Sequence, residues 1–141
     1  MGDIAHTGRM DGNMHLYPVR VYFEDTDAGG IVYHANYLKY MERARTEMLR
    51  CLDFSHEKLM AENETMFVAR RCELEYRAPA RLDDALTVKT TLCEFGKVRL
   101  HLDQDIYLGD QLITIGKIEL VSTDLAGKPK RLPKTFMDVI S

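Results

Sequence analysis

The sequence predicts an α+β domain in which one long helix packs on an antiparallel sheet of about five strands. Three observations carry this prediction. Residues 36–52 repeat apolar side chains at spacings of three and four, as an amphipathic helix does. Residues 66–121 instead alternate apolar and polar side chains at a period of two. Short turns at Gly96 and at Gly109 separate long strands, which favours antiparallel neighbours.

Length and charge limit the classes of protein to which the chain can belong. Its 141 residues, 45% of them hydrophobic, suffice for one globular domain and leave no room for a second of similar size. The 19 basic and 22 acidic side chains are mixed along the sequence, which argues against a nucleic-acid partner. No apolar run approaches the ~20 residues that span a bilayer, and no secretory signal is recognisable. We therefore expect a cytoplasmic protein without an integral membrane segment.

The three cysteines, Cys51, Cys72 and Cys93, are odd in number and contain no C-x-x-C pair. They predict neither a disulfide framework nor a thiolate zinc site, and they fit a reducing compartment. We expect no metal ion and no resident cofactor.

The N-terminal part of the chain divides into a tail and a first strand. Residues 1–17 are rich in Gly, Asp, Asn, His and Met without periodicity, so we expect a flexible tail there and a single domain over residues 18–141. The β-prone residues 19–23 predict a strand that leads into the Asp- and Gly-rich residues 24–30. We therefore expect an acidic loop directly after the first strand.

The helix predicted over residues 36–52 starts at Asn36, a residue type that favours the N-cap position. Its wide apolar arc suits a helix that is wrapped by a curved sheet. Arg45 lies inside this arc, which predicts a partner carboxylate or an interface contact, or else a packed stem with the charged head in water. We give the isolated His56 and His101 structural or surface roles.

The strands predicted after this helix leave apolar surface uncovered. A short helical segment at residues 55–61 precedes strands over residues 66–78, 86–92, 98–108 and 111–121. One helix cannot cover five long strands, and Ile113, Ile115 and Val121 lie on the opposite faces. We therefore predict burial by a second subunit in a homo-oligomer, at least a dimer.

Asp25 and Asp27 form the densest group of polar side chains in the sequence, and three interpretations of this pair are possible. As turn formers, their side chains would bond the local backbone. As a D-x-D pair they could be the nucleophiles of a haloacid dehalogenase-type phosphatase or two magnesium ligands. Such sites normally follow buried parallel strands, whereas this chain has an antiparallel pattern. In the third interpretation, a catalytic carboxylate precedes a helix.

The helix matters because its first turn leaves N–H groups unpaired and carries a partial positive charge. These groups can polarise a carbonyl oxygen and stabilise the oxyanion that forms on attack. Asp27 lies a few residues upstream, where its carboxylate could activate water or attack an acyl carbon itself. Because a thiolate leaves readily without a strong acid, these two features suffice for thioester hydrolysis.

The residues around this loop resemble a known family. The run Tyr22–Tyr37, continuing into Tyr40–Glu47, closely resembles the 4-hydroxybenzoyl-CoA thioesterase group of hotdog proteins. Within that group it is most similar to the YbgC-type acyl-CoA thioesterases associated with the bacterial Tol-Pal system. The segments Tyr76–Asp84 and Arg131–Lys134 also look like that subfamily, and the resemblance covers roughly residues 18–138.

The resemblance implies a hotdog fold, with a long central helix wrapped by the sheet, and dimers that pair into tetramers. The essential aspartate of the family matches Asp27, and its carbonyl-polarising backbone amide matches His34 or its immediate neighbourhood. The His34 side chain would bind substrate or assist proton transfer, or would merely pack at the helix start. Tyr33 would form a pocket wall or donate its hydroxyl.

A basic turn near the C-terminus is the candidate site for coenzyme phosphates. It offers a hydroxyl pair, Ser122 and Thr123, followed by three cations, Lys128, Lys130 and Arg131. Related thioesterases use comparable positions. The alternative is an exposed basic turn without a ligand.

The leading hypothesis is therefore a bacterial acyl-CoA thioesterase of lipid metabolism, which hydrolyses its substrate to a carboxylic acid and CoA at a site shared across a subunit interface. The alternative is a non-catalytic hotdog protein that binds acyl-CoA or acyl carrier protein and is linked to a membrane-associated assembly. A hotdog dehydratase would need an acidic partner for His34, and no suitable carboxylate is evident.

Overall fold

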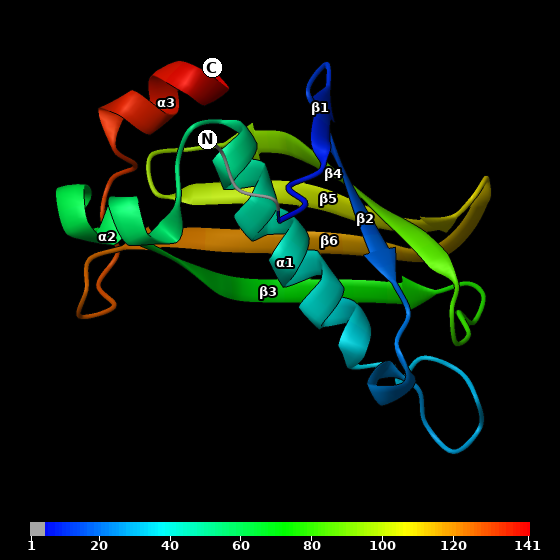
Figure 1. Ribbon diagram of the computed structural model, residues 1–141. Coiled ribbons are helices and arrows are strands. Elements are labelled where there is room, and N and C mark those ends of the chain that lie inside the picture. The colour runs from blue at the N-terminus through cyan, green and yellow to red at the C-terminus, as the bar shows by residue number, and fades with distance from the viewer. Residues whose placement is uncertain (1–4) are drawn as a thin grey trace.

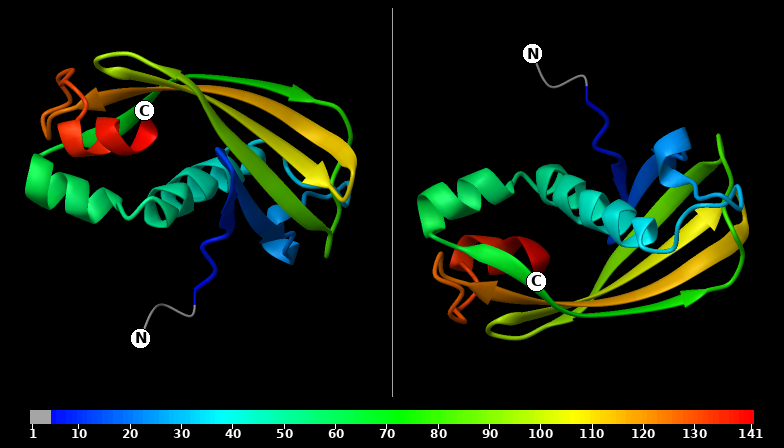
Figure 2. Two further views of the ribbon diagram at one scale, coloured as in Figure 1. Left: turned by 90° about the horizontal axis from the view of Figure 1, so that it is seen from above. Right: turned by 90° about the horizontal axis from the view of Figure 1, so that it is seen from below.

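A curved antiparallel sheet wraps the helix α1, Asn36–Cys51, in the computed structural model, which describes residues 5–141 (Figures 1 and 2). The sheet has six strands in the order β1-β2-β4-β5-β6-β3. The strands are β1 Arg9–Asp11, β2 Met14–Arg20, β3 Met66–Tyr76, β4 Ala85–Phe95, β5 Arg99–Leu108 and β6 Gln111–Thr123. The other helices are η1 Phe23–Asp25, α2 His56–Asn63 and α3 Lys134–Ile140. The predicted α+β arrangement is confirmed, with six strands in place of about five.

The N-terminal segment differs from the predicted tail. Residues 1–4 lie outside the described part, but residues 9–17 belong to the hairpin β1-β2, so the expectation of a tail there is wrong. Gly12 and Asn13 form the tight turn, and Gly12 has a φ of +62° that suits glycine. The hairpin is anchored by the buried His15, whose Nε2 lies 2.8 Å from the carbonyl oxygen of Thr7.

The core lies between α1 and the concave face of the sheet. Strands β4 and β5 bury every second residue, as their alternation predicts. The residues at the centre of this layer are fully buried: Tyr40, Met41 and Ala44 from α1, with Leu86, Val88, Ile106, Ile113 and Ile118 from the sheet. Ile113 therefore belongs to the core of this chain, and only Ile115 and Val121 of the predicted second-face residues are half-buried.

Polar contacts fix α1 on the sheet. The Nη1 atom of Arg45 donates to Oε1 of Gln104 at 2.9 Å, so the guanidinium has an amide partner in place of the predicted carboxylate. Gln104 is fully buried, and its Nε2 donates to the carbonyl of Met41 at 2.9 Å and to Oγ1 of Thr90 at 3.0 Å. The N-cap is Ala35, not Asn36 as predicted from residue type. Gln104 thus joins the helix to β4 and β5.

Strand β3 lies at one edge of the sheet and pairs only with β6. Most of its side chains are exposed, including the apolar Val68 at 42%. A long, exposed edge strand presents unpaired backbone groups that can pair with another chain. None of the helices in residues 5–141 is long and apolar enough to cross a membrane.

Candidate active site at the start of the long helix

Asp27 stands at the first position of a tight turn between η1 and α1. Its backbone N–H donates to the carbonyl of Ile31 at 2.9 Å, and its carbonyl accepts from Gly30, whose φ is +79°. The Oδ1 atom of Asp27 accepts from the backbone N–H of Gly29 at 2.8 Å. The carboxylate is exposed, and its Oδ2 atom accepts no hydrogen bond from residues 5–141. One oxygen is therefore held while the other is free to react.

Asp25 has different contacts. Its Oδ2 accepts from the N–H of Tyr22 at 2.8 Å, and its carbonyl accepts from the N–H of Tyr33 and from Nδ2 of Asn36, both at 2.9 Å. Burial, and then the nearby Asp25 carboxylate, raises the pKa of the Tyr40 hydroxyl, although no hydrogen bond of good geometry joins them. Asp25 thus ties η1 to the start of α1, which supports a structural role.

The start of α1 presents free donors next to this turn. Within residues 5–141, the backbone N–H groups of His34 and Ala35 have no acceptor, whereas that of Asn36 bonds the carbonyl of Tyr33 at 2.8 Å. Tyr76 fixes this corner from β3, because its hydroxyl donates to the carbonyl of His34 at 3.0 Å. The unpaired N–H groups thus lie on the same loop as Asp27, on the helix side of the bridge between Thr26 and Val32.

The predicted aromatic residues lie at the same corner. The rings of Tyr33 and His34 are 4.5 Å apart, and both side chains are exposed in the single chain. Phe23 is 81% exposed and Tyr22 is 61% exposed on the same loop. These side chains together give the loop an exposed apolar surface.

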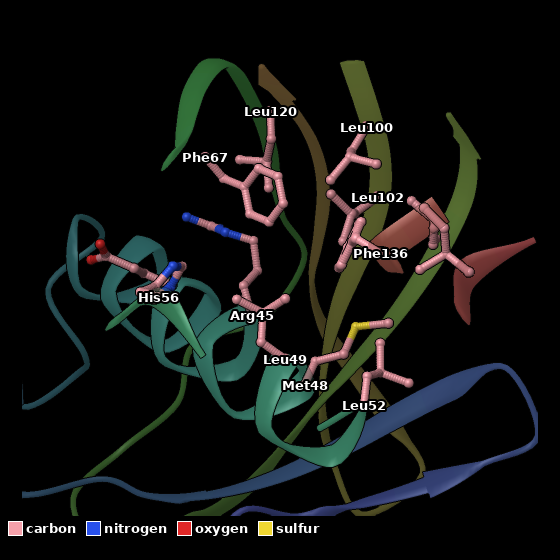
Figure 3. A pocket seen from close by; sticks show the side chains of 13 residues that line it. Arg45, Met48, Leu49, Leu52, His56, Phe67, Leu100, Leu102, Leu120 and Phe136 are labelled. Carbon is pink, nitrogen blue, oxygen red and sulfur yellow. The ribbon is translucent and has the colours of Figure 1, made fainter. Parts of the chain in front are cut away.

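A separate apolar pocket lies at the opposite end of α1 (Figure 3). It has a volume of about 80 Å³, and its walls come from α1, α2, β3 to β6 and α3. Its polar lining residues are Glu42, Arg45 and His56, and its apolar lining residues include Phe67, Leu100, Leu102, Leu120 and Phe136. Sequence reasoning missed this pocket because its residues come from segments far apart in the chain.

His56 was expected to have a structural or surface role, and the structure places it on the pocket wall. Its Nε2 lies 3.0 Å from Oγ1 of Thr46 on α1. Burial, and then the positive charge of Arg45, holds the pKa of His56 below its usual range. His56 is therefore biased toward the neutral form.

Acid is expected to destabilise the fold through His15 and His56. Burial lowers the pKa of both side chains from the usual 6.5, so below that pH the unfolded chain binds more protons than the folded chain. The free energy of unfolding should fall as the pH drops through 6.5 toward the lowered values. Urea titrations at several pH values measure this. The double replacement His15→Gln/His56→Gln should flatten the slope, whereas the exposed His6→Gln should not, and an equal slope in all three proteins contradicts the assignment.

The predicted phosphate-binding residues lie at the end of β6 and on the turn that follows it, and they differ in exposure and in hydrogen bonds. Ser122 and Thr123 are buried, and the hydroxyl of Thr123 donates to the carbonyl of Asp124 at 2.9 Å. The ammonium group of Lys130 donates to the carbonyl of Asn63 at the end of α2. Lys128 and Arg131 remain exposed cations.

No group of three or more His, Cys, Asp or Glu side chains in residues 5–141 could hold a metal ion.

Comparisons with known proteins identify the family to which the chain belongs. The model of the thioesterase-like superfamily matches residues 21–140. The acyl-CoA thioester hydrolase YbgC of Escherichia coli O6:H1 is 45% identical over 91% of this chain and 96% of its own length. The acyl-CoA thioesterase YbgC of Haemophilus influenzae is 40% identical over 86% and 90% of the two chains. A probable thioesterase from Bartonella henselae, known from its crystal structure, has a TM-score of 0.83 and 37% identity, over 85% of this chain and 99% of its own.

Proposed function

Because this chain belongs to the thioesterase-like superfamily, we propose that it hydrolyses acyl-CoA thioesters to a carboxylic acid and free CoA, with Asp27 as its catalytic carboxylate. One observation carries the residue assignment. The carboxylate of Asp27 lies on the turn before α1, and one of its two oxygens accepts no hydrogen bond from residues 5–141. The backbone N–H groups of His34 and Ala35, immediately before the first residue of α1, are also unpaired within these residues. Asp27 would therefore act as the base or nucleophile, and the two N–H groups on the same loop would bind the oxyanion.

Two routes satisfy the chemistry. As a general base, Asp27 takes a proton from water while the oxygen attacks the carbonyl carbon. The oxyanion forms against the N–H groups at the start of α1, and its collapse expels the CoA thiolate, which takes up the proton. As a nucleophile, Asp27 attacks the carbon itself and displaces the thiolate, and water then hydrolyses the mixed anhydride to regenerate the carboxylate. The exposed imidazole of His34 would assist proton transfer in either route.

The two ends of β3 support a site that is shared between two subunits. At one end, Tyr76 bonds His34 beside the catalytic turn. At the other end, Phe67 lines the apolar pocket, and Met66 pairs with Thr123 at the start of the basic turn. The 11 residues of β3 separate these ends by roughly 33 Å at about 3.3 Å per residue.

A second copy that pairs antiparallel along the exposed edge of β3 would bring these ends together. A two-fold axis near the middle of the strand places the Tyr76 end of one subunit opposite the Met66 end of its partner. The Asp27 turn of one subunit would then face the pocket and the exposed cations of the other, Lys128 and Arg131. The aromatic loop residues around Asp27 would be covered in the same assembly. The tetramer, the cytoplasmic location and a carrier protein as partner stay predictions.

The pairing predicts that a charge on the β3 edge weakens both assembly and turnover. Val68→Asp places a carboxylate on the exposed edge, and the dimer dissociation constant should rise about tenfold or more, as for a misplaced interfacial charge. Sedimentation equilibrium measures it. Val139→Asp, on an equally exposed valine of α3, is the matched control and should leave assembly intact. A wild-type chain that is monomeric and fully active contradicts the shared site.

The proposed activity is tested by thiol release from a panel of acyl-CoAs of different chain lengths. Turnover of at least one chain length is expected. If the purified protein binds acyl-CoA tightly and hydrolyses no chain length, the proposal is wrong and the protein is an acyl-CoA-binding protein.

A further inference from the structure

We propose that the apolar pocket under α3 holds the acyl chain of the substrate, and that Phe136 and Ile140 of α3 set the longest chain it accepts. This inference rests on the proposed function, and it adds a chain-length determinant far from Asp27 in the sequence. Its support comes from the lining of the pocket, the position of its polar residues and a second hollow behind α3.

The lining of the pocket suits an alkyl chain. Its volume of about 80 Å³ is well above the roughly 10–15 Å³ that one water molecule needs. Ten of its 13 lining residues are apolar, and Figure 3 shows Leu100, Leu102 and Phe136 gathered on one side of the space. The polar lining residues are Glu42, Arg45 and His56, and Figure 3 shows Arg45 and His56 on the other side of the view from those three apolar residues. An apolar chain would therefore lie toward the leucines, with its polar end toward Arg45.

One wall of the pocket lies at the edge of the sheet where the shared site would form. Glu42 is exposed, and Phe67 stands at the start of β3, the end that a paired subunit would bring to the Asp27 turn. The guanidinium of Arg45 makes its one side-chain hydrogen bond with Gln104 and forms no ion pair within residues 5–141. It is thus free to meet a polar group where the acyl chain enters.

Helix α3 forms the far wall of the pocket. Phe136 is 3% exposed and packs against Phe54 and Phe67, with ring centroids 5.2 and 5.3 Å apart. Behind α3 lies a second, open hollow that shares four lining residues with the pocket: Met48, Leu52, Leu92 and Ile140. Only a layer of side chains therefore divides the two spaces. Smaller side chains on α3 would join the pocket to the hollow and lengthen the space available to a chain.

The test compares kcat/KM for acetyl-, butyryl-, hexanoyl-, octanoyl- and decanoyl-CoA in four proteins. Phe136→Leu and Ile140→Ala enlarge the far end, and Asp138→Ala is the control on an exposed position of the same helix. The ratio of kcat/KM for octanoyl-CoA to that for butyryl-CoA should rise about tenfold in the two enlarged variants, the scale of a few methylene contacts. The control should keep the wild-type ratio. If Phe136→Leu fails to fold, Ile140→Ala, at a partly exposed position, still tests whether α3 limits the chain length.

An unchanged chain-length profile in folded Ile140→Ala and Phe136→Leu overturns the inference while leaving the proposed hydrolysis intact. A failure of the proposed hydrolysis itself is distinguished from this result with non-hydrolysable S-alkyl-CoA thioethers. If no acyl-CoA is hydrolysed, calorimetric affinities for butyl- and octyl-CoA thioethers replace the kinetic ratio. A shift toward the octyl thioether in the enlarged variants then supports the pocket without the enzyme, and no shift overturns it.

Discussion

Replacing Asp27 by Asn is expected to lower kcat by about 10²- to 10⁴-fold, the contribution of a positioned acid or base. The amide of Asn can still accept the N–H of Gly29 through its oxygen, so the turn before α1 should keep its shape. The substitution removes the negative charge with which the carboxylate would take a proton from water or attack the acyl carbon. Thiol release under saturating acyl-CoA measures kcat, and the melting temperature should stay within a few degrees of the wild type.

Glu24→Gln is the matched control for this substitution. Glu24 is an exposed carboxylate on the same loop and accepts no hydrogen bond from residues 5–141. Its replacement also removes one negative charge near the site, and turnover should change by less than about twofold because screened surface charges contribute little. Equal losses in the two variants would assign the effect to the net charge of the loop and remove Asp27 from the mechanism.

Gly116→Val is expected to lower the free energy of unfolding by about 3 kcal/mol, the upper range for overpacked cores. Gly116 lies on β6 where α1 crosses the sheet. A Cβ atom there would stand 2.6 Å from the carbonyl oxygen of Gln104 and 2.7 Å from Cε of Met41. The backbone oxygen cannot move without disturbing the pairing of β5 with β6, so the helix must lift from the sheet.

Urea denaturation of Gly116→Val and of Gly96→Val gives the comparison. Gly96 lies in the turn between β4 and β5, and a Cβ atom there meets nothing within 4 Å. Its replacement should change the free energy of unfolding by less than about 0.5 kcal/mol, as at other unconstrained surface positions. Similar losses at the two positions would show that Gly116 does not set the approach of α1 to the sheet.

The main elements could be predicted because each has a strong period. The helix over residues 36–52 and the strands after residue 66 follow their apolar patterns to within a few residues. The hairpin β1-β2 could not be predicted, since β1 has only 3 residues and one of the two buried residues of β2 is a histidine, His15. The turn pair Gly12 and Asn13 was the one available signal.

The candidate site was predictable only where it is local in sequence. Asp27 and His34 lie within one loop, so the sequence alone puts both on the segment before α1. The pocket could not be predicted, because residues from Glu42 to Ile140 meet there only after the sheet has curved around α1. Ser122 was proposed for the coenzyme from its residue type, and its burial beside β3 depends on tertiary packing that no short pattern records.

A crystal structure of Asp27→Asn with an intact acyl-CoA tests the central claim most directly. The account predicts the thioester carbonyl oxygen about 2.7–3.1 Å from a backbone nitrogen at His34 or Ala35, the distance range of an oxyanion site. The carbonyl carbon should lie beside Asn at position 27, with the acyl chain entering the pocket of the second subunit. A thioester bound away from the start of α1, with its carbonyl out of reach of residue 27, would contradict the account.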